Sequence, residues 1–334
     1  MSLSVIIPVF NGEKTLKKCL VSVFRSEDVD FEVVVVDDAS SDRSAGIARE
    51  FSCRLILSEQ NRGAAASRNA GAREASGDVL VFLDADMYVF PDTLKMIEGI
   101  FEEDPAVRIV GGTCAPEAPS NGWGPTLFAL QYYYTLKWGD GEERKTTSAL
   151  PSDLAAIDRE VFNGSGGFDE SFKGAGVEEY ELGSRLSAEY PIWLYRKVRA
   201  VHDFPPVLMR ARKLFRRSIT YVPFFLNKRS FEAAGQMPNR ENALLSVSAF
   251  GVCAGAALSL VFPLTGLFLV LGFALLYSLN IRSLLRFIHR EKGGGFTVFS
   301  FFILFYLYLV VGLGFSTGLV KVGLERLKAT GKQA

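Results

Sequence analysis

The sequence predicts an α/β fold with a mostly parallel sheet, followed by interfacial helices and a C-terminal α-helical transmembrane region. Two observations predict it. Over residues 1–102, short apolar runs alternate with amphipathic segments of helical period, the pattern of successive β/α units. From Asn242 onward the chain is almost continuously apolar, whereas the first two thirds have the composition of an ordinary globular protein.

The N-terminal pattern predicts strands and helices in alternation. Strands are expected at 3–9, 31–36, 54–57 and 79–83, and helices at 13–24, 41–51, 64–75 and 91–102. Asn11 is a candidate N-cap of the first helix. Further on, the polar residues 142–148 predict a loop, and regular structure returns at 152–162, with a helix at 177–190 and a strand at 194–201.

Composition excludes some classes of protein. The 37 Lys and Arg residues balance 37 Asp and Glu residues, so no nucleic-acid partner is expected. The four cysteines are scattered, with neither metal-ligand spacing nor the pattern of a disulfide framework. A strand at 3–9 leaves no room for a signal peptide before it, so residues 1–205 are expected to face the cytosol.

Residues 206–241 carry basic side chains interleaved with apolar ones. A solvated helix face is the plainer interpretation. Because an apolar region follows directly, we favour amphipathic helices that lie on anionic lipid headgroups.

Residues 242–320 are expected to cross the cell membrane. Residues 243–281 fit two spans joined by a turn at 262–266, the basic residues 282–292 form a cytosolic loop, and 296–320 fit a third span. A third span would place the basic tail, 321–334, outside, against the positive-inside rule. Breaks at Gly312, Gly314 and Gly318 would instead make a re-entrant hairpin, so two to four crossings are expected.

Polar residues follow each of the predicted strands. In an open parallel sheet, ligands bind beyond the carboxyl ends of the strands, where such residues converge. Asp84 and Asp86 matter most, because two carboxylates flanking one residue can face one point, and hard oxygen ligands suit Mg²⁺ or Mn²⁺. Taken alone, the pair is equally well an acidic turn.

The residues at these strand ends resemble the successive motifs of family 2 glycosyltransferases with the Rossmann-like GT-A fold. The motifs are Val5-Ile6-Ile7-Pro8-Val9-Phe10-Asn11, Val36-Asp37-Asp38-Ala39-Ser40-Ser41-Asp42, Asn61-Arg62-Gly63 with Arg68-Asn69, and Phe82-Leu83-Asp84-Ala85-Asp86. The resemblance covers about residues 2–200, and implies a GT-A catalytic domain over residues 1–205 and a nucleotide-sugar donor.

The resemblance also implies roles for individual residues. The nucleotide would be held by Pro8, Val9, Phe10, Asn11, Asp38, Asn61, Arg68 and Asp84. Asp86, with Asp84, would bind the metal on the donor diphosphate, and His202 would complete the metal site. A lone His is equally well a satisfied structural residue. The family's members are inverting enzymes, which implies a single in-line displacement.

On the acceptor side, Gly167, Phe168 and Asp169 resemble a loop of the family. Glu178 and Glu179 stand where many members have Glu-Asp, whose Asp is the general base. Glu179 is therefore the candidate base, one methylene longer than the family's Asp. The alternative is a charged helix start that interacts favourably with the helix dipole.

These observations predict transfer of a single sugar, from a UDP-sugar, to a hydroxyl on a glycolipid or lipid-linked saccharide. Single transfer is favoured because the Gln-x-x-Arg-Trp motif of processive synthases is missing from the sequence. A polyprenyl-phosphate acceptor, already anionic, would need no base. A non-catalytic nucleotide-sugar-binding membrane subunit stays an alternative. A nucleotidyltransferase is disfavoured, because the residues after the first strand are poor in glycine.

Overall fold

The structure is a computed structural model that describes residues 1–119, 122–172, 178–228 and 240–330. It divides into two compact units. The first, here called the sheet unit, holds residues 1–121 and 135–204, and the second, the helical unit, holds 122–134 and 205–334. Helix α5 (Trp123–Thr135) follows the sixth strand in the chain, yet nearly all of it belongs to the helical unit.

The sheet unit is built on a nine-stranded sheet with the order β3-β2-β1-β4-β8-β6-β9-β5, with β7 also pairing with β9. The strands are β1 (Leu3–Val9), β2 (Phe31–Asp37), β3 (Arg54–Leu57), β4 (Val79–Leu83), β5 (Met87–Val89), β6 (Ile109–Cys114), β7 (Arg144–Thr147), β8 (Leu154–Asp158) and β9 (Ile192–His202). β1 to β4 pair in parallel, as does β6 with β9, whereas β8, β5 and β7 pair with their neighbours antiparallel.

Helices cover both faces of this sheet, which explains why its central strands are apolar throughout. Alternate residues of β1 enter different cores, with Val5 and Ile7 in one and Ile6 in the other. The first core includes residues of α1 (Leu16–Val23), α2 (Ser44–Ala48) and α4 (Thr93–Glu103). The second includes residues of α3 (Ala64–Glu74), α6 (Arg159–Gly164) and α7 (Glu178–Leu186). The predicted α/β class is confirmed.

Two local predictions in the sheet unit are wrong. Asn11 does not cap the first helix, which begins at Leu16 after Thr15. Asn11 instead adopts a left-handed backbone (φ 52°), which asparagine tolerates better than most residues. The predicted loop at 142–148 contains strand β7, because β9, distant in sequence, supplies its hydrogen-bonding partner. A polar edge strand carries little apolar signal of its own.

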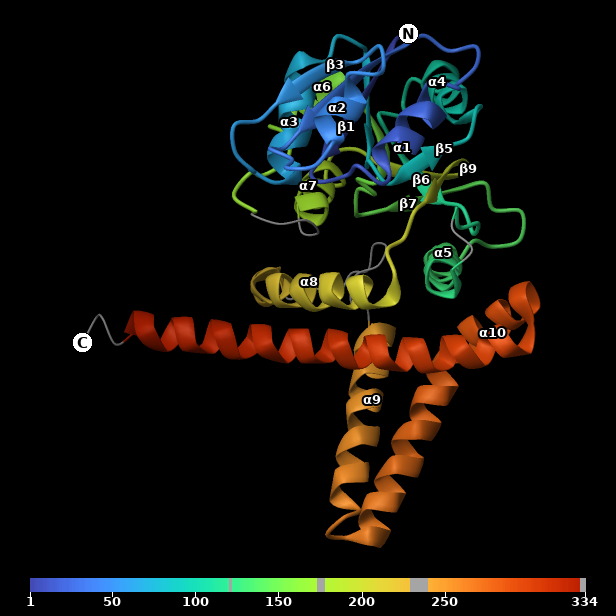
Figure 1. Cartoon of the computed structure of the whole chain (residues 1–334), viewed down its shortest axis with the longest axis vertical. Helices are drawn as coiled ribbons and strands as arrows, with labels where there is room; N and C mark the ends of the chain where they lie inside the picture. Colours follow the sequence, from blue (N-terminus) through green and yellow to red (C-terminus); the bar gives the residue numbers. More distant parts are fainter. Residues whose placement is uncertain (120–121, 173–177, 229–239, 331–334) are drawn as a thin grey trace. The chain divides into compact units, whose positions relative to one another are not determined.

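The helical unit contains α5, α8 (Val207–Lys228), α9 (Arg240–Leu258) and α10 (Pro263–Thr330). Helix α10 is two helices joined at Gly293, whose backbone is not helical. Figure 1 shows that α9 and the first part of α10 form a long hairpin, while the second part of α10 runs beside α8 and across the hairpin. By length and composition, α9 and α10 can each cross a membrane.

Two further predictions are wrong here. Residues 282–292 are helical rather than a loop, since they continue the first part of α10. Gly312, Gly314 and Gly318 do not break the last segment, because they lie within the continuous second part of α10 and contact neighbouring helices closely. The rest of the predicted interfacial region, 229–239, and tail residues 331–334 lie outside the described residues.

Two helical glycines of the sheet unit allow a matched stability test. A Cβ at Gly71 would lie 2.4 Å from Ile6 Cγ2, whereas one at Gly99 would meet nothing within 4 Å. We expect Gly71→Ala to destabilise the protein by about 1–3 kcal/mol, because the buried contact is overpacked. Gly99→Ala should stabilise it by about 0.5–1 kcal/mol, through helix propensity alone. Thermal unfolding midpoints check both, and equal shifts in the two variants would contradict the packing argument.

Candidate active site at the carboxyl edge of the sheet

The loops after β1 and β2 are tied together by hydrogen bonds. The Asn11 amide donates to Ser40 Oγ at 2.9 Å, and Asn11 Oδ1 accepts from the Ser41 amide at 2.9 Å. The Gly12 amide donates to Ser44 Oγ at 2.9 Å. These bonds hold the predicted nucleotide residues at the end of β1 in one conformation, with Val9 buried and Phe10 53% exposed.

Asp38 ties the next loop to the end of β2. Its two carboxylate oxygens accept hydrogen bonds from the backbone amides of Arg62 and Gly63, each at 2.8 Å. The Asn61 side-chain amide donates to the Asp38 carbonyl oxygen at 3.4 Å. Asp38 is 3% exposed, so this carboxylate orders the loop from which α3 starts. Its predicted contact with a nucleotide base stays a prediction.

A buried arginine joins the donor-side and acceptor-side residues. Arg68, in α3, is 3% exposed, and its guanidinium contacts Asp84 Oδ1 at 2.7 Å and Glu178 Oε1 at 3.2 Å. Glu178, at the start of α7, is 1% exposed, whereas the Asp84 side chain keeps 32% of its surface exposed. The guanidinium also lies over the Phe168 ring, 5.3 Å from its centroid.

The surroundings of this cluster shift the pKa values of Arg68 and Asp84. Burial alone lowers the pKa of Arg68, but Asp84 and Glu178 outweigh it and raise the pKa, so the guanidinium stays protonated. Burial raises the pKa of the Asp84 carboxyl; the nearby charges of Asp86 and Asp153 add to this, and Arg68 opposes it. The carboxyl groups of Asp84, Asp86 and Asp153 are close enough to interact at the end of β4, where a cation would be stabilised.

Asp86 and His202 form the second pair at this edge. Strand β5 pairs with β9, which places His202 opposite Met87, and Asp86 Oδ2 lies 3.5 Å from His202 Nε2. The Asp86 backbone is held near the end of β9, because the Asp203 amide donates to the Asp86 carbonyl oxygen at 2.8 Å. The His202 ring stacks on Phe204, with centroids 4.0 Å apart.

These side chains fit a divalent cation that also has ligands from a diphosphate. Oxygen and imidazole donors suit Mn²⁺, and oxygen donors suit Mg²⁺. The interacting carboxyl groups near Asp84 favour a cation as well. Within the described ranges, no group of three or more His, Cys, Asp or Glu residues is placed to hold a metal ion, so the diphosphate would have to supply part of the coordination.

Glu178 and Glu179 are neighbours in α7 but have different surroundings. Glu178 is buried in the ion pair with Arg68. Glu179 is partly exposed, and its Oε2 accepts a hydrogen bond from Ser152 Oγ at 3.0 Å. The predicted pair of catalytic carboxylates is thus divided between two environments.

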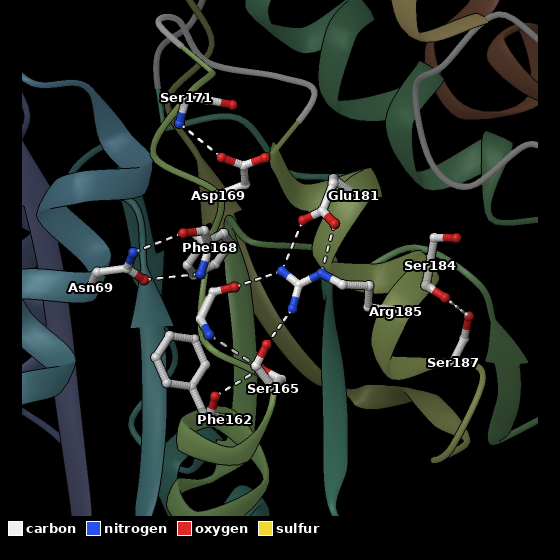
Figure 2. A network of polar contacts seen from close by, with 11 residues as sticks. Asn69, Phe162, Ser165, Phe168, Asp169, Ser171, Glu181, Ser184, Arg185 and Ser187 are labelled. Atoms are coloured by element: carbon white, nitrogen blue, oxygen red, sulfur yellow. Dashed lines mark hydrogen bonds and ion pairs between the residues drawn. The ribbon is translucent and has the colours of Figure 1, made fainter. Parts of the chain in front are cut away.

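The acceptor-side loop, residues 166–170, is held by α3 and α7. Asn69 binds the Phe168 backbone twice, accepting from its amide at 2.9 Å and donating to its carbonyl oxygen at 2.8 Å. Figure 2 shows this pair and, on the other side of the loop, Arg185 between Glu181 and the loop carbonyls. Arg185 Nη2 donates to the Gly167 carbonyl oxygen at 2.6 Å. Asp169 lies at the exposed end, where its Oδ1 accepts from the Ser171 amide.

Three residues of the site were missed from the sequence. Ser152 binds Glu179, and Asp153 contributes charge near Asp84 and accepts the Asp84 amide through its carbonyl oxygen at 3.1 Å. Arg185 fixes the acceptor-side loop. The signal for the first two was the polar pair Ser152-Asp153 directly before an apolar strand. Because β8 runs antiparallel to β4, residues before β8 lie at the same edge as residues after β4.

Comparison with known proteins finds glycosyltransferases. Residues 4–165 match the sequence model of Glycosyl transferase family 2. An uncharacterized glycosyltransferase of Haemophilus influenzae is 28% identical over 194 residues, covering 56% of this chain and 62% of that protein. A validoxylamine A glucosyltransferase of Streptomyces hygroscopicus is 30% identical over 217 residues, covering 56% of this chain and 48% of that protein. The matches thus span about half to under two thirds of these relatives' own lengths.

Among solved structures, a mannosyltransferase of Pyrobaculum calidifontis in complex with GDP-Man and Mn²⁺ aligns with a TM-score of 0.57 at 17% identity. The alignment covers 95% of this chain and 86% of that chain, and it shows a likeness in fold. The sheet and its carboxyl-edge residues define a GT-A domain. Residues 4–165 are a domain of family 2 of the glycosyltransferases.

Mutation tests whether the hydrogen bonds of Asn69 stabilise the acceptor-side loop. We expect Asn69→Ala to destabilise the protein by about 1–3 kcal/mol, since it leaves the buried Phe168 backbone groups unsatisfied. Arg73→Ala is the control, because Arg73 is 61% exposed and reaches the same loop only through an ion pair with Glu170 at 3.9 Å. That exposed pair should contribute less than about 1 kcal/mol. Thermal unfolding midpoints compare the two, and equal losses would contradict the assigned role of Asn69.

Proposed function

We propose that this chain is a metal-dependent, inverting glycosyltransferase that moves one sugar from a nucleotide-diphosphate sugar, a UDP-sugar, to a membrane-associated hydroxyl. One observation carries the proposal. In a family 2 domain, buried Arg68 joins Asp84, on the donor side, to Glu178, next to the candidate base. Donor and acceptor groups are thereby held in one rigid arrangement, as a single displacement requires.

The donor nucleotide would lie along the ordered loops after β1 and β2. Pro8 to Asn11 and the loop held by Asp38 form the floor for the base and ribose, and Asn61 lies beside them. The two terminal nitrogens of Arg68, Nη1 and Nη2, each contact a carboxylate. Its proposed contribution to nucleotide binding is therefore to orient Asp84, whose side chain is the more exposed partner.

Asp86, with Asp84 and His202, would hold Mg²⁺ or Mn²⁺ on the donor diphosphate. A divalent ion there neutralises charge that develops on the leaving diphosphate. The relative from Pyrobaculum calidifontis binds GDP-Man with Mn²⁺, which supports a metal and a nucleotide sugar of this general kind. The choice of UDP for this chain rests on the sequence prediction.

Glu179 is the proposed general base. The acceptor oxygen attacks the anomeric carbon as the bond from that carbon to the diphosphate oxygen breaks, and Glu179 takes the acceptor's proton. Glu178 does not fit this role, because it is buried and its charge already balances Arg68. Ser152 orients Glu179 through its hydrogen bond. The loop of Gly167, Phe168 and Asp169 would bind the acceptor beside Glu179.

The acceptor is proposed to be a glycolipid or lipid-linked saccharide in the cell membrane, with the sheet unit in the cytosol. The exposed apolar side chains of the hairpin, such as Leu260, Leu264 and Phe268, support membrane attachment. The exposed Arg212 and Lys213 of α8 support contact with anionic headgroups. A carboxylate placed as a base favours a hydroxyl over a polyprenyl phosphate, which needs none.

Replacing Asp86 tests the metal assignment. We expect Asp86→Asn to lower donor turnover about 100-fold or more while leaving thermal stability unchanged, because the carboxylate that would hold the charge-neutralising metal is lost. Release of UDP from a UDP-sugar is measured against Mn²⁺ concentration. Asp92→Asn is the control, since Asp92 precedes α4 and makes no side-chain cap hydrogen bond. Metal-dependent turnover that survives in Asp86→Asn would remove the assignment.

Replacing each glutamate separates the base from its neighbour. We expect Glu179→Gln to reduce transfer to a hydroxyl about 10²- to 10⁴-fold with little change in thermal stability. Glu178→Gln, in contrast, should also lower thermal stability, since it leaves the buried Arg68 with one fewer charge partner. Transfer to glycolipid and to polyprenyl phosphate is compared for both. If Glu179→Gln keeps full activity and the phosphate is the better acceptor, the hydroxyl proposal fails and the polyprenyl-phosphate alternative replaces it.

A further inference from the structure

The arrangement of helices within the helical unit bears on how the chain meets the membrane. We infer that only the hairpin of α9 and the first part of α10 crosses the bilayer. The second part of α10, residues 294–330, here called the surface segment, lies along the same membrane surface as α8. The inference rests on the proposed membrane attachment and deepens it, because it sets the number of crossings at two and the side on which the surface segment lies.

The hairpin has the length and composition of two spans. Residues between Glu241 and Arg282 include no charged side chain. Helix α9 has 19 residues, which corresponds to about 28 Å of helix and so to the hydrocarbon core of a bilayer. Its Gly251 and Gly255 lie against Phe273 and Val270, so the two helices approach closely, as membrane helices commonly do.

Gly293 ends the first part of α10 and lets the chain change direction. Its backbone, at φ 77° and ψ −177°, is one that only glycine adopts readily. The sequence continues with Gly294 and Gly295. After this point the surface segment runs across the hairpin rather than along it (Figure 1).

The position of Tyr308 argues against a third span. It lies at the middle of the uncharged stretch 294–320, so in a spanning helix it would be near the bilayer midplane. Its hydroxyl donates to Asn242 Oδ1 at 3.1 Å. Asn242 lies in the first turn of α9, next to Glu241, which belongs at the membrane surface. Tyr308 is therefore at the surface level too, about 15 Å from the midplane of a typical bilayer.

The other helix of the hairpin meets the segment at the same level. Tyr277, about one turn before Arg282, packs against Phe301 and Phe305 with centroids 5.5 and 5.3 Å apart. Both helices of the hairpin thus contact the surface segment at their charged ends. A segment that descended beside the hairpin would leave these ends after its first turns.

The contact between α8 and the surface segment also argues against a third span. A Cβ at Gly314 would lie 2.6 Å from the Phe215 carbonyl oxygen, and one at Gly318 would lie 2.7 Å from Val222 Cγ2. The two glycines, four residues apart, let the backbones of α8 and the segment pack closely together. Because α8 carries exposed Arg212 and Arg216, its helix partner cannot enter the hydrocarbon as a span without drawing charge in.

The partner of the segment's remaining apolar face is the bilayer itself. The exposed residues of this face recur at intervals of four and seven, as on one side of a helix: Val298, Phe302, Tyr306, Leu313, Val320 and Leu324. Acyl chains of the leaflet beneath α8 would cover it, and the basic side chains of α8 would meet anionic headgroups. Two crossings also place the basic residues 282–292 and 321–330 on one side, as the positive-inside rule requires.

Cysteine labelling in sealed membrane vesicles from cells tests the inference on the full chain. Cys53 and Cys253 are first replaced by serine, which leaves the buried Cys19 and Cys114. Three single variants follow: Lys213→Cys in α8, Thr265→Cys at the turn of the hairpin, and Lys321→Cys in the surface segment. Each is treated with a membrane-impermeant maleimide before and after permeabilisation with detergent, and carbonate extraction establishes membrane insertion beforehand.

We expect Lys321→Cys to be labelled under the same condition as Lys213→Cys, and Thr265→Cys under the opposite one. Labelling of Lys321→Cys together with Thr265→Cys would overturn the inference in favour of a third span. Extraction of the chain by carbonate would overturn the membrane attachment on which the inference rests. Neither readout uses transferase activity, so the proposed reaction stands or falls separately, on the variants of Asp86 and Glu179.

Discussion

The buried guanidinium of Arg68 is the interaction on which the site depends. A cation removed from water needs compensating charge nearby, and Asp84 and Glu178 supply it from two elements far apart in the sequence. The end of β4 and the start of α7 are consequently held at a fixed separation. Asp86 is two residues from Asp84, and Glu179 follows Glu178, so a structural ion pair positions both the proposed metal ligand and the proposed base.

Much of this edge of the sheet was predictable, and the reason is local. A buried parallel strand is recognisable from its apolar run, and the polar residues directly after it must lie at the carboxyl edge. Asp38, Asp84 and Asp86 were found in this way. What each one binds was not predictable, because the amides that Asp38 accepts come from Arg62 and Gly63, and Glu178 is 110 residues from Arg68. Such pairings are decided by packing rather than by local pattern.

The helical unit shows a different limit of sequence interpretation. Glycine within a helix of a soluble protein suggests that the helix breaks there. Gly312, Gly314 and Gly318 were interpreted in this way. In an apolar helix, the missing side chain instead admits a neighbouring backbone, and only Gly293 interrupts the helix. The basic residues 282–292 likewise suggested a loop, although charged residues extend an apolar helix beyond the hydrocarbon at little cost. In the two-crossing topology proposed above, the conflict with the positive-inside rule disappears, because the surface segment is not a span.

The adjacent carboxylates of α7 show how a helix separates two tasks. Successive residues in an α-helix point about 100° apart, so one of two neighbours can face the core while the other stays partly exposed. Glu178 takes the buried direction, towards Arg68, and Glu179 takes the direction of Ser152. The Glu179 side chain is longer than that of the Asp common in the family. Without a hydrogen-bond partner it would occupy several positions. The hydrogen bond from Ser152 restricts it, which supports the proposal that a glutamate is the base at this position.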